Sequence, residues 1–213
     1  MRLRVESVIL ACLAAICCLT SVALPETYRG IGYLDTLGEL RSTFPGASFE
    51  KQTPAWATTS DAMYKITGAG LSGTIIVKMS DPRPATALMA ATTTDDSLKG
   101  EYDRIVAEDD DAALEVDWVR WVPAEPLPLQ RFVLKYGNPD KPGFSDDDMT
   151  PFRTWNRRGL SAYLDDTQRL VRRVDFSFTS SEIAAGMKKR YGIDPSYWHH
   201  SATIRRRRPA RHP

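Results

Sequence analysis

Histidine and cysteine are scarce in this chain, and both are confined to its two ends. The cysteines and histidines of the 213-residue sequence are Cys12, Cys17, Cys18, His199, His200 and His212. The long segment between them therefore lacks the residues for a histidine-based catalytic triad, a thiolate nucleophile, a disulfide or a cysteine metal site. Adjacent histidines such as His199-His200 seldom converge on one ion, so we predict no metal site.

Other motifs of catalytic and cofactor-binding proteins are also missing. The sequence has no Gly-x-Gly-x-x-Gly and no phosphate-binding loop, so we predict no cofactor. The acidic runs 108–111 and 146–148 lack the ligand spacing of an EF-hand, which favours solvated loops over calcium sites. Carboxylates are plentiful, however, and only their separation in space decides whether two of them could hydrolyse a polymer. A protein without catalytic activity is favoured, and a carboxylate-dependent hydrolase is the alternative.

The first 23 residues have the pattern of a cleavable secretory signal. Arg2 and Arg4 precede an uncharged apolar run over residues 8–22, which is too short to cross a bilayer as a helix. Ser21-Val22-Ala23 then supplies small residues before the expected cleavage point. All three cysteines lie in this segment, so cleavage would leave a mature chain without cysteine. We predict a periplasmic or secreted protein.

Two alternatives for this N-terminal segment stay open. The run Ile9-Leu10-Ala11-Cys12 is similar to a lipoprotein cleavage box, in which Cys12 would be lipidated. The apolar run could instead remain attached as a short membrane anchor. The first alternative would make the protein an envelope-anchored structural lipoprotein.

Charge is distributed unevenly along the mature chain. Residues 24–187 carry seven more acidic than basic side chains, and residues 188–213 carry seven more basic than acidic ones. We predict that residues 188–213 form a basic, disordered tail. Outside the cytoplasm its run Arg205, Arg206, Arg207 and Arg208 fits anionic lipid, acidic polysaccharide or the acidic body of the protein itself, and we predict no nucleic-acid partner.

The body of the sequence contains two similar stretches, which predict an internal repeat. Leu37-Gly38-Glu39-Leu40 and Leu129-Gln130-Arg131-Phe132 open two short amphipathic helices, with apolar residues at helical spacing. Each helix runs into a turn signal, Pro45-Gly46 in one case and Gly137-Asn138-Pro139 in the other. Further along, Gly70-Leu71-Ser72 matches Gly159-Leu160-Ser161.

Strands are predicted after each helix, which gives an α+β fold of two tandem helix-plus-antiparallel-sheet repeats. Runs of apolar residues that alternate with polar ones, bounded by turn residues, predict these strands at residues 62–67, 72–79, 116–122, 152–156, 160–164 and 170–178. The first repeat spans 24–122 and the second 123–187, with the stiff connector Pro123–Pro128 between them. An insertion, 81–115, interrupts the first repeat, with a helix near 98–106 and a loosely ordered part near 85–94.

This arrangement resembles the fold shared by the β-lactamase inhibitor protein and the outer-membrane assembly lipoproteins of the SmpA/OmlA (BamE) type. The segment from Leu129 to Pro139, with Gly137-Asn138-Pro139, is similar to the family's helix and turn motif. The first copy departs from it with Phe44-Pro45-Gly46, and a cysteine-free body has no disulfides like those of the inhibitor protein. The resemblance implies protein binding in the cell envelope without naming a partner.

Tryptophan and arginine, the commonest energetic anchors of protein interfaces, suggest where such binding would occur. Trp118, Arg120 and Trp121 lie on one predicted strand, and Arg157 and Arg158 lie on a predicted hairpin turn. Packing of both tryptophans in the core is the structural alternative. We therefore predict an exported bacterial cell-envelope protein that binds an envelope protein without catalysis, with a hydrolase of envelope polymers or a structural lipoprotein as alternatives.

Overall fold

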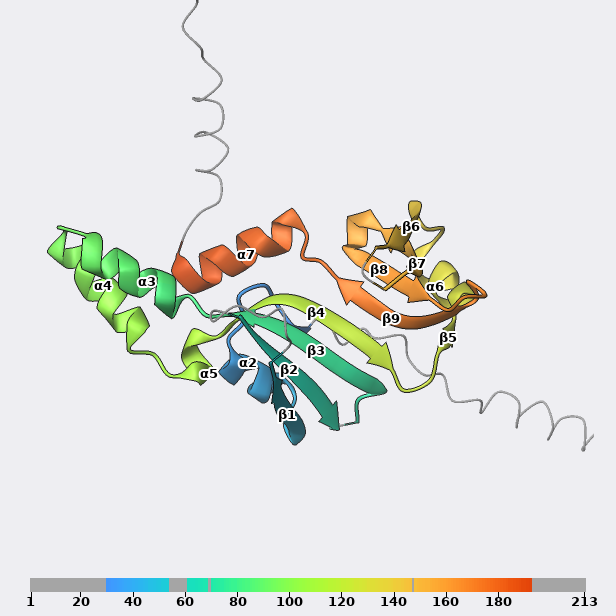
Figure 1. Ribbon diagram of the computed structural model, residues 1–213, viewed down its shortest axis with the longest axis horizontal. Helices are drawn as coiled ribbons and strands as arrows, with labels where there is room; N and C mark the ends of the chain where they lie inside the picture. Colours follow the sequence, from blue (N-terminus) through green and yellow to red (C-terminus); the bar gives the residue numbers. More distant parts are fainter. Residues whose placement is uncertain (1–29, 54–60, 69, 147, 193–213) are drawn as a thin grey trace, which may run out of the picture.

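The computed structural model describes residues 30–53, 61–68, 70–146 and 148–192. The predicted signal and the arginine run Arg205–Arg208 lie outside these residues. The described residues form six α-helices and nine strands that belong to one antiparallel sheet (Figure 1). The predicted α+β class is therefore confirmed.

The sheet consists of two groups of four strands that meet in its middle. Its strand order is β1-β2-β3-β4-β9-β8-β7-β6, and the short strand β5 pairs separately with β9. The strands are β1 (Ala47–Gln52), β2 (Asp61–Gly68), β3 (Gly73–Ser80), β4 (Glu115–Pro123), β5 (Leu127–Pro128), β6 (Lys141–Ser145), β7 (Thr150–Trp155), β8 (Leu160–Leu164) and β9 (Leu170–Phe176).

One helix precedes each group of four strands. Helix α2 (Leu37–Thr43) comes before β1, and helix α6 (Leu129–Tyr136) comes before β6. The predicted helix starts Leu37 and Leu129 are confirmed, and their successors Leu40 and Phe132 are both buried. Thr36 starts α2 with a capping box, in which its side chain and that of Glu39 satisfy each other's backbone N–H groups.

The core lies on one side of the sheet because apolar residues alternate along the strands. Ile66 on β2, Val77 on β3 and Trp121 on β4 all point to this side and are at most 2% exposed. Leu40 of α2 and Phe132 of α6 pack into the same continuous cluster. The two helices therefore share one core with both halves of the sheet.

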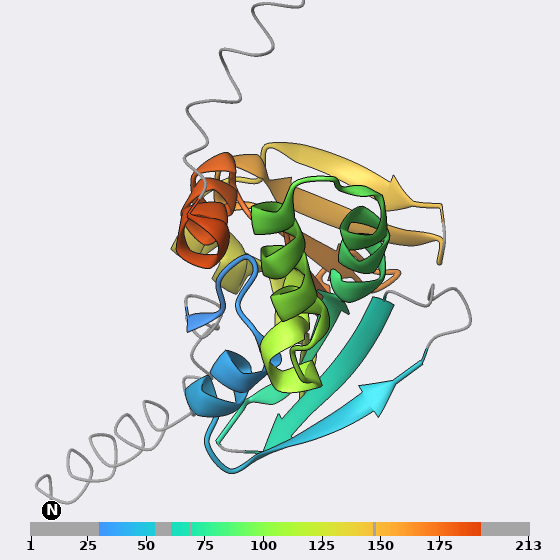
Figure 2. The same cartoon turned by 90° about the vertical axis from the view of Figure 1, so that its left-hand side faces the viewer.

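A helical insertion separates β3 from β4. It contains α3 (Arg83–Thr92), α4 (Asp96–Val106) and the single turn α5 (Asp110–Ala113). Figures 1 and 2 show α3 and α4 side by side, projecting from one end of the sheet. The helix predicted near residues 98–106 is confirmed, whereas the expectation of loose order near 85–94 is wrong, since α3 covers most of that segment.

The last helix, α7 (Ser180–Tyr191), runs past the predicted start of the basic tail at Lys188. Thr179 and Glu182 form a capping box at its first turn, and Gly192 caps its end in the left-handed region with φ of 68°. Residues 188–191 are therefore helical, and the prediction of a disordered tail from residue 188 is wrong for them. Because α7 continues through these residues, Lys189 and Arg190 lie against the acidic residues Asp35, Glu39 and Glu115.

A buried ion-pair cluster fastens the end of α7 to the start of β4. Arg190 donates from Nε to Glu115 Oε1 at 2.6 Å and from Nη2 to Glu108 Oε2 at 2.8 Å. The Tyr191 hydroxyl donates to the same Glu115 carboxylate at 2.6 Å from Oε2. Burial, followed by the Glu115 carboxylate, raises the pKa of Tyr191. Glu115 is only 3% exposed, and these hydrogen bonds offset the cost of burying its carboxylate.

We expect Arg190→Ala to lower the free energy of unfolding by about 3 kcal/mol, because it leaves the buried Glu115 carboxylate without its cation. Lys188→Ala removes the same charge from an exposed position two residues before Arg190. It is expected to change stability by less than about 0.5 kcal/mol. Urea denaturation of both variants measures the difference, and equal small effects would contradict the role given to Arg190.

Candidate functional site

The side of the sheet opposite the core, here called the open face, carries a mixture of aromatic and charged side chains. These residues alternate with the core residues along each strand and are mostly half-buried. Those in the middle of the sheet are Ile76, Lys78, Trp118, Arg120, Phe152, Ser161, Tyr163, Arg173 and Asp175.

Arg120 and Asp175 form the centre of the open face. They are directly opposite each other in the β4–β9 pair, and Arg120 donates to both carboxylate oxygens at 2.7 and 2.8 Å. Burial opposes the charge of Arg120, but the Asp175 carboxylate outweighs it and raises the pKa of the guanidinium. This two-point contact fixes the plane of the guanidinium.

Trp118 lies against that fixed guanidinium. The Arg120 Cζ atom is 4.5 Å from the centre of the Trp118 ring, in cation–π geometry. Because Asp175 holds Arg120 and Arg120 stacks on Trp118, the indole has a defined position before any partner arrives. A large half-buried aromatic ring is thus presented in one orientation.

A second stack covers the β7–β9 part of the open face. The rings of Phe152 and Tyr163 are 5.2 Å apart, and Arg173 Cζ lies 3.8 Å from the Tyr163 ring centre. Arg173 also pairs with Asp148. Burial, with a smaller effect of Asp175, raises the pKa of Tyr163, so its hydroxyl remains a hydrogen-bond donor at neutral pH.

An irregularity in the pairing of β3 with β4 shapes the end of the open face beside Trp118. The register shifts between Lys78 and Met79, so that Asp117 is an extra residue on β4. Lys78 donates to Asp117 at 2.9 Å and lies 3.4 Å from Asp61. Its hydrogen bond to Asp117 raises the pKa of Lys78.

A notch of about 420 Å³ lies between this bulge and α7, and we call it the Trp118 notch. Its lining residues are Tyr33, Lys78, Asp117, Trp118, Ser177, Phe178 and Ile183. The apolar part comes from the aromatic rings and from Ile183 of α7, which is 39% exposed. The polar part is the Lys78–Asp117 pair. The notch can therefore receive an apolar side chain whose end is polar.

The structure separates the site residues that the sequence singles out. Trp118 and Arg120 lie together on the open face, whereas Trp121 points into the core and is 2% exposed, so it offers no surface to a partner. Arg157 and Arg158 lie on the short 3-10 turn η2 (Asn156–Arg158) between β7 and β8. They form a separate group near the end of α6.

Sequence reasoning missed the residues of the open face that pack with or hold its aromatic rings and Arg120, namely Phe152, Tyr163, Arg173 and Asp175. All four lie on strands that the sequence does predict, at positions that alternate with apolar core residues such as Ala162. The alternation of polar and apolar residues along these strands was therefore the signal that could have pointed to the four residues. It shows which residues share a face of a strand, but not which strands become neighbours in the sheet.

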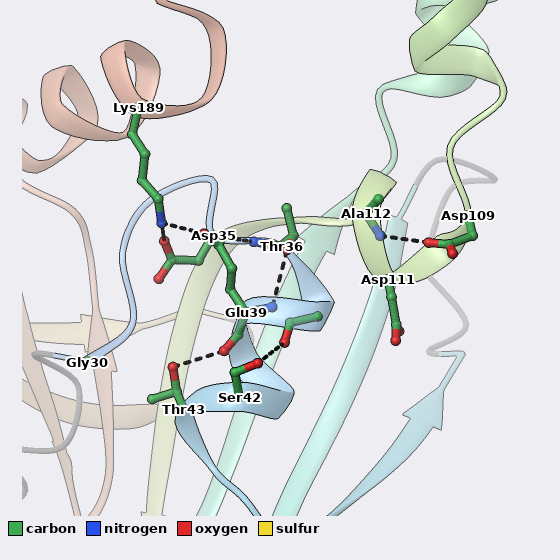
Figure 3. Close-up of a pocket in the computed structure, with 11 residues that line it drawn as sticks. Gly30, Asp35, Thr36, Glu39, Ser42, Thr43, Asp109, Asp111, Ala112 and Lys189 are labelled. Carbon is green, nitrogen blue, oxygen red and sulfur yellow. Dashed lines mark hydrogen bonds and ion pairs between the residues drawn. The ribbon is translucent and has the colours of Figure 1, made fainter.

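A larger pocket of about 630 Å³ beside α2 consists of groups that already serve the fold (Figure 3). Lys189 of α7 reaches Asp35 at 2.9 Å and Glu39 at 2.7 Å, and these contacts raise the pKa of Lys189. Burial alone would raise the pKa of Glu39, but Lys189 and Thr36 reverse this and lower it. The pocket is thus part of the attachment of α7.

The carboxylates of the open face have partners. Asp175 is held by Arg120, and Asp117 by Lys78. Within the part of the chain that the structure describes, no group of three or more histidine, cysteine, aspartate and glutamate residues could hold a metal ion. No helix in that part has the length and apolar character needed to cross a membrane.

Comparison with known proteins found no match. No protein-family model matches the chain, and no curated protein or solved structure matches it.

We expect the two tryptophans to respond differently to truncation. Trp121→Ala should lower the free energy of unfolding by about 3–5 kcal/mol, because it leaves a cavity in the core. Trp118→Ala should cost about 1 kcal/mol, because a half-buried ring loses less contact area. Urea denaturation distinguishes the two, and a larger cost at Trp118 would mean that its ring, and not that of Trp121, is the structural one.

Proposed function

We propose that this chain is an exported bacterial cell-envelope protein that acts without catalysis by binding another protein through the open face. The strand order supports a tandem origin, since a helix followed by a group of four strands (β1–β4, and β6–β9) occurs twice, and the two groups meet where β4 pairs with β9. That arrangement is the one expected from the resemblance to the β-lactamase inhibitor protein. The proposed export, and any role of the basic run Arg205–Arg208, rest on the sequence alone.

The observation that carries the proposal is the ordered stack of aromatic and arginine side chains on the open face. Trp118, Arg120 and Tyr163 each have a fixed neighbour, so a partner does not need to immobilise them. Side chains held in place before binding lose less conformational entropy at an interface. Tryptophan, tyrosine and arginine are also the residue types that most often dominate binding energy.

The Trp118 notch gives this surface a place for a single anchoring side chain. Binding energy in protein interfaces concentrates where one partner's side chain fills a pocket on the other. The apolar ring of Trp118 and the exposed Ile183 side chain would contact such a group, and the Lys78–Asp117 pair would meet its polar end. We therefore expect the partner to insert an aromatic or long side chain here.

Site-specific photocrosslinking in producing cells tests the surface. Probes at Ile76 and Ser161 lie on the open face, and a probe at Leu134 lies on α6 with 78% exposure as the control. We expect one discrete protein adduct from the two open-face probes and none from Leu134. Equal adducts from all three positions, or none from the open face, would contradict the proposal.

Affinity measurements with the crosslinked protein then assign the anchors. Trp118→Ala and Tyr163→Ala should each weaken binding about tenfold or more, as expected for interface anchors. Leu134→Ala removes an exposed apolar side chain from α6, away from the open face, and should leave the affinity unchanged. Thermal unfolding of each variant separates loss of binding from loss of fold.

Mass spectrometry of the mature protein tests its export. We expect an N-terminus at Leu24 after removal of the signal. A diacylglyceryl-modified Cys12 would instead show an envelope-anchored lipoprotein, and an intact Met1 would contradict cleavage altogether.

A further inference from the structure

A third pocket lies away from the open face, where α6 ends. It has a volume of about 370 Å³ and is lined by Tyr136, Asn138, Asp140, Trp155, Arg157 and Arg158. It combines the end of α6, the loop that follows it and the η2 turn. None of these residues belongs to the open face, so a function for the pocket would add to the proposed protein binding.

The walls of this pocket are held by hydrogen bonds within the protein. Trp155 is 3% exposed and donates from Nε1 to the Gly137 carbonyl at 2.9 Å. The Asn156 N–H donates to Asp140 Oδ2 at 2.7 Å, and the Asp140 N–H donates to the Thr154 carbonyl at 2.8 Å. The loop and the turn are therefore joined across the pocket, and its shape is set before a ligand binds.

The cationic side of the pocket has unused hydrogen-bond donors. Arg157 and Arg158 are exposed, and within the described residues neither forms an ion pair or a hydrogen bond from its side chain. Arg158 lies 5.5 Å from the centre of the Tyr136 ring, which holds its guanidinium beside the pocket. Arg120 and Arg190 differ from them, since each of those is bound to a carboxylate.

The other polar side chains of the pocket, Asn138 and Asp140, can accept hydrogen bonds, which the two arginines cannot. Asn138 contributes an amide, with both donors and an acceptor, and Asp140 contributes a carboxylate that accepts hydrogen bonds. A guanidinium pair binds carboxylate or phosphate groups in a two-point geometry. The complementary ligand therefore has an oxyanion at one end and hydroxyl groups at the other.

We propose that this pocket binds an acidic sugar, that is, a sugar ring with a carboxylate or phosphate group. Arg157 and Arg158 bind the oxyanion, and Asn138 and Asp140 bind ring hydroxyls. The pocket lies in the lower part of the size range for small-molecule sites, about 300–1,000 Å³, which suits one or two sugar rings. In an exported protein such a ligand would come from acidic polysaccharide or from phosphorylated surface sugars.

Titrations followed by NMR test the site with two acidic probes, glucuronate and glucose 6-phosphate. Reporters are the indole N–H of Trp155, which lines the pocket, and the backbone N–H of Asn156, which donates to the lining residue Asp140. We expect saturable shifts at millimolar concentrations with at least one probe, and the stronger of the two identifies the oxyanion. Neutral glucose and inorganic phosphate should each bind at least about tenfold more weakly, because each lacks one half of the ligand.

Variants assign the effect to the arginine pair. Arg157→Ala and Arg158→Ala should each weaken binding of the preferred probe about tenfold. Arg104→Ala removes an equal charge from an exposed position on α4, and Trp118→Ala alters the open face, so both should leave the titration unchanged.

Three results would overturn the proposal. These are the absence of saturable shifts with both acidic sugars, equal binding of inorganic phosphate, and equal weakening by Arg104→Ala.

Discussion

The structure depends on a short seam in the middle of the sheet, where β4 pairs with β9. Three residue pairs form it: Val119 with Phe176, Arg120 with Asp175, and Trp121 with Val174. The outer two pairs point into the core and the middle pair points to the open face, so one register joins the hydrophobic interior and the arginine–aspartate contact. A shift of one residue would exchange the two faces and bury Arg120 without its partner. The core and the open face are thus specified together.

The same alternation explains why two tryptophans three residues apart have different roles. Trp118 and Trp121 point to opposite sides of β4, and the register shift between Lys78 and Met79 leaves Asp117 as the extra residue beside Trp118. The rings are therefore divided between the open face and the core. Their chemical identity alone could not assign these roles, because tryptophan is common both in cores and in interfaces.

Local features of the fold could be read from the sequence, and the long-range ones could not. The helix starts at Leu37 and Leu129 follow from apolar spacing and turn residues, and most strands follow from alternation. The β4–β9 seam joins residues more than 50 positions apart in the chain, as Arg120 and Asp175 show. The cations Lys188, Lys189 and Arg190 suggested the start of a disordered tail, but residues 188–191 are helical. In this fold Glu39 pairs with Lys189, and Glu108 and Glu115 pair with Arg190.

The attachment of α7 links the stability of the fold to the shape of the proposed binding surface. Little apolar surface holds this helix: Gly186 is its one buried residue, and an added Cβ there would meet the Tyr33 carbonyl oxygen at 2.2 Å. Its position therefore depends on close backbone contact and on the ion pairs of Lys189 and Arg190. The more exposed of these, at Lys189, is weakened by salt, while the buried one at Glu115 is screened much less. Ile183 of α7 lines the Trp118 notch, so the contacts that hold α7, the buried Arg190–Glu115 pair among them, also place one wall of that notch. The ion pairs that hold α7 at one end of the sheet thus help to place an apolar side chain, Ile183, beside the open face.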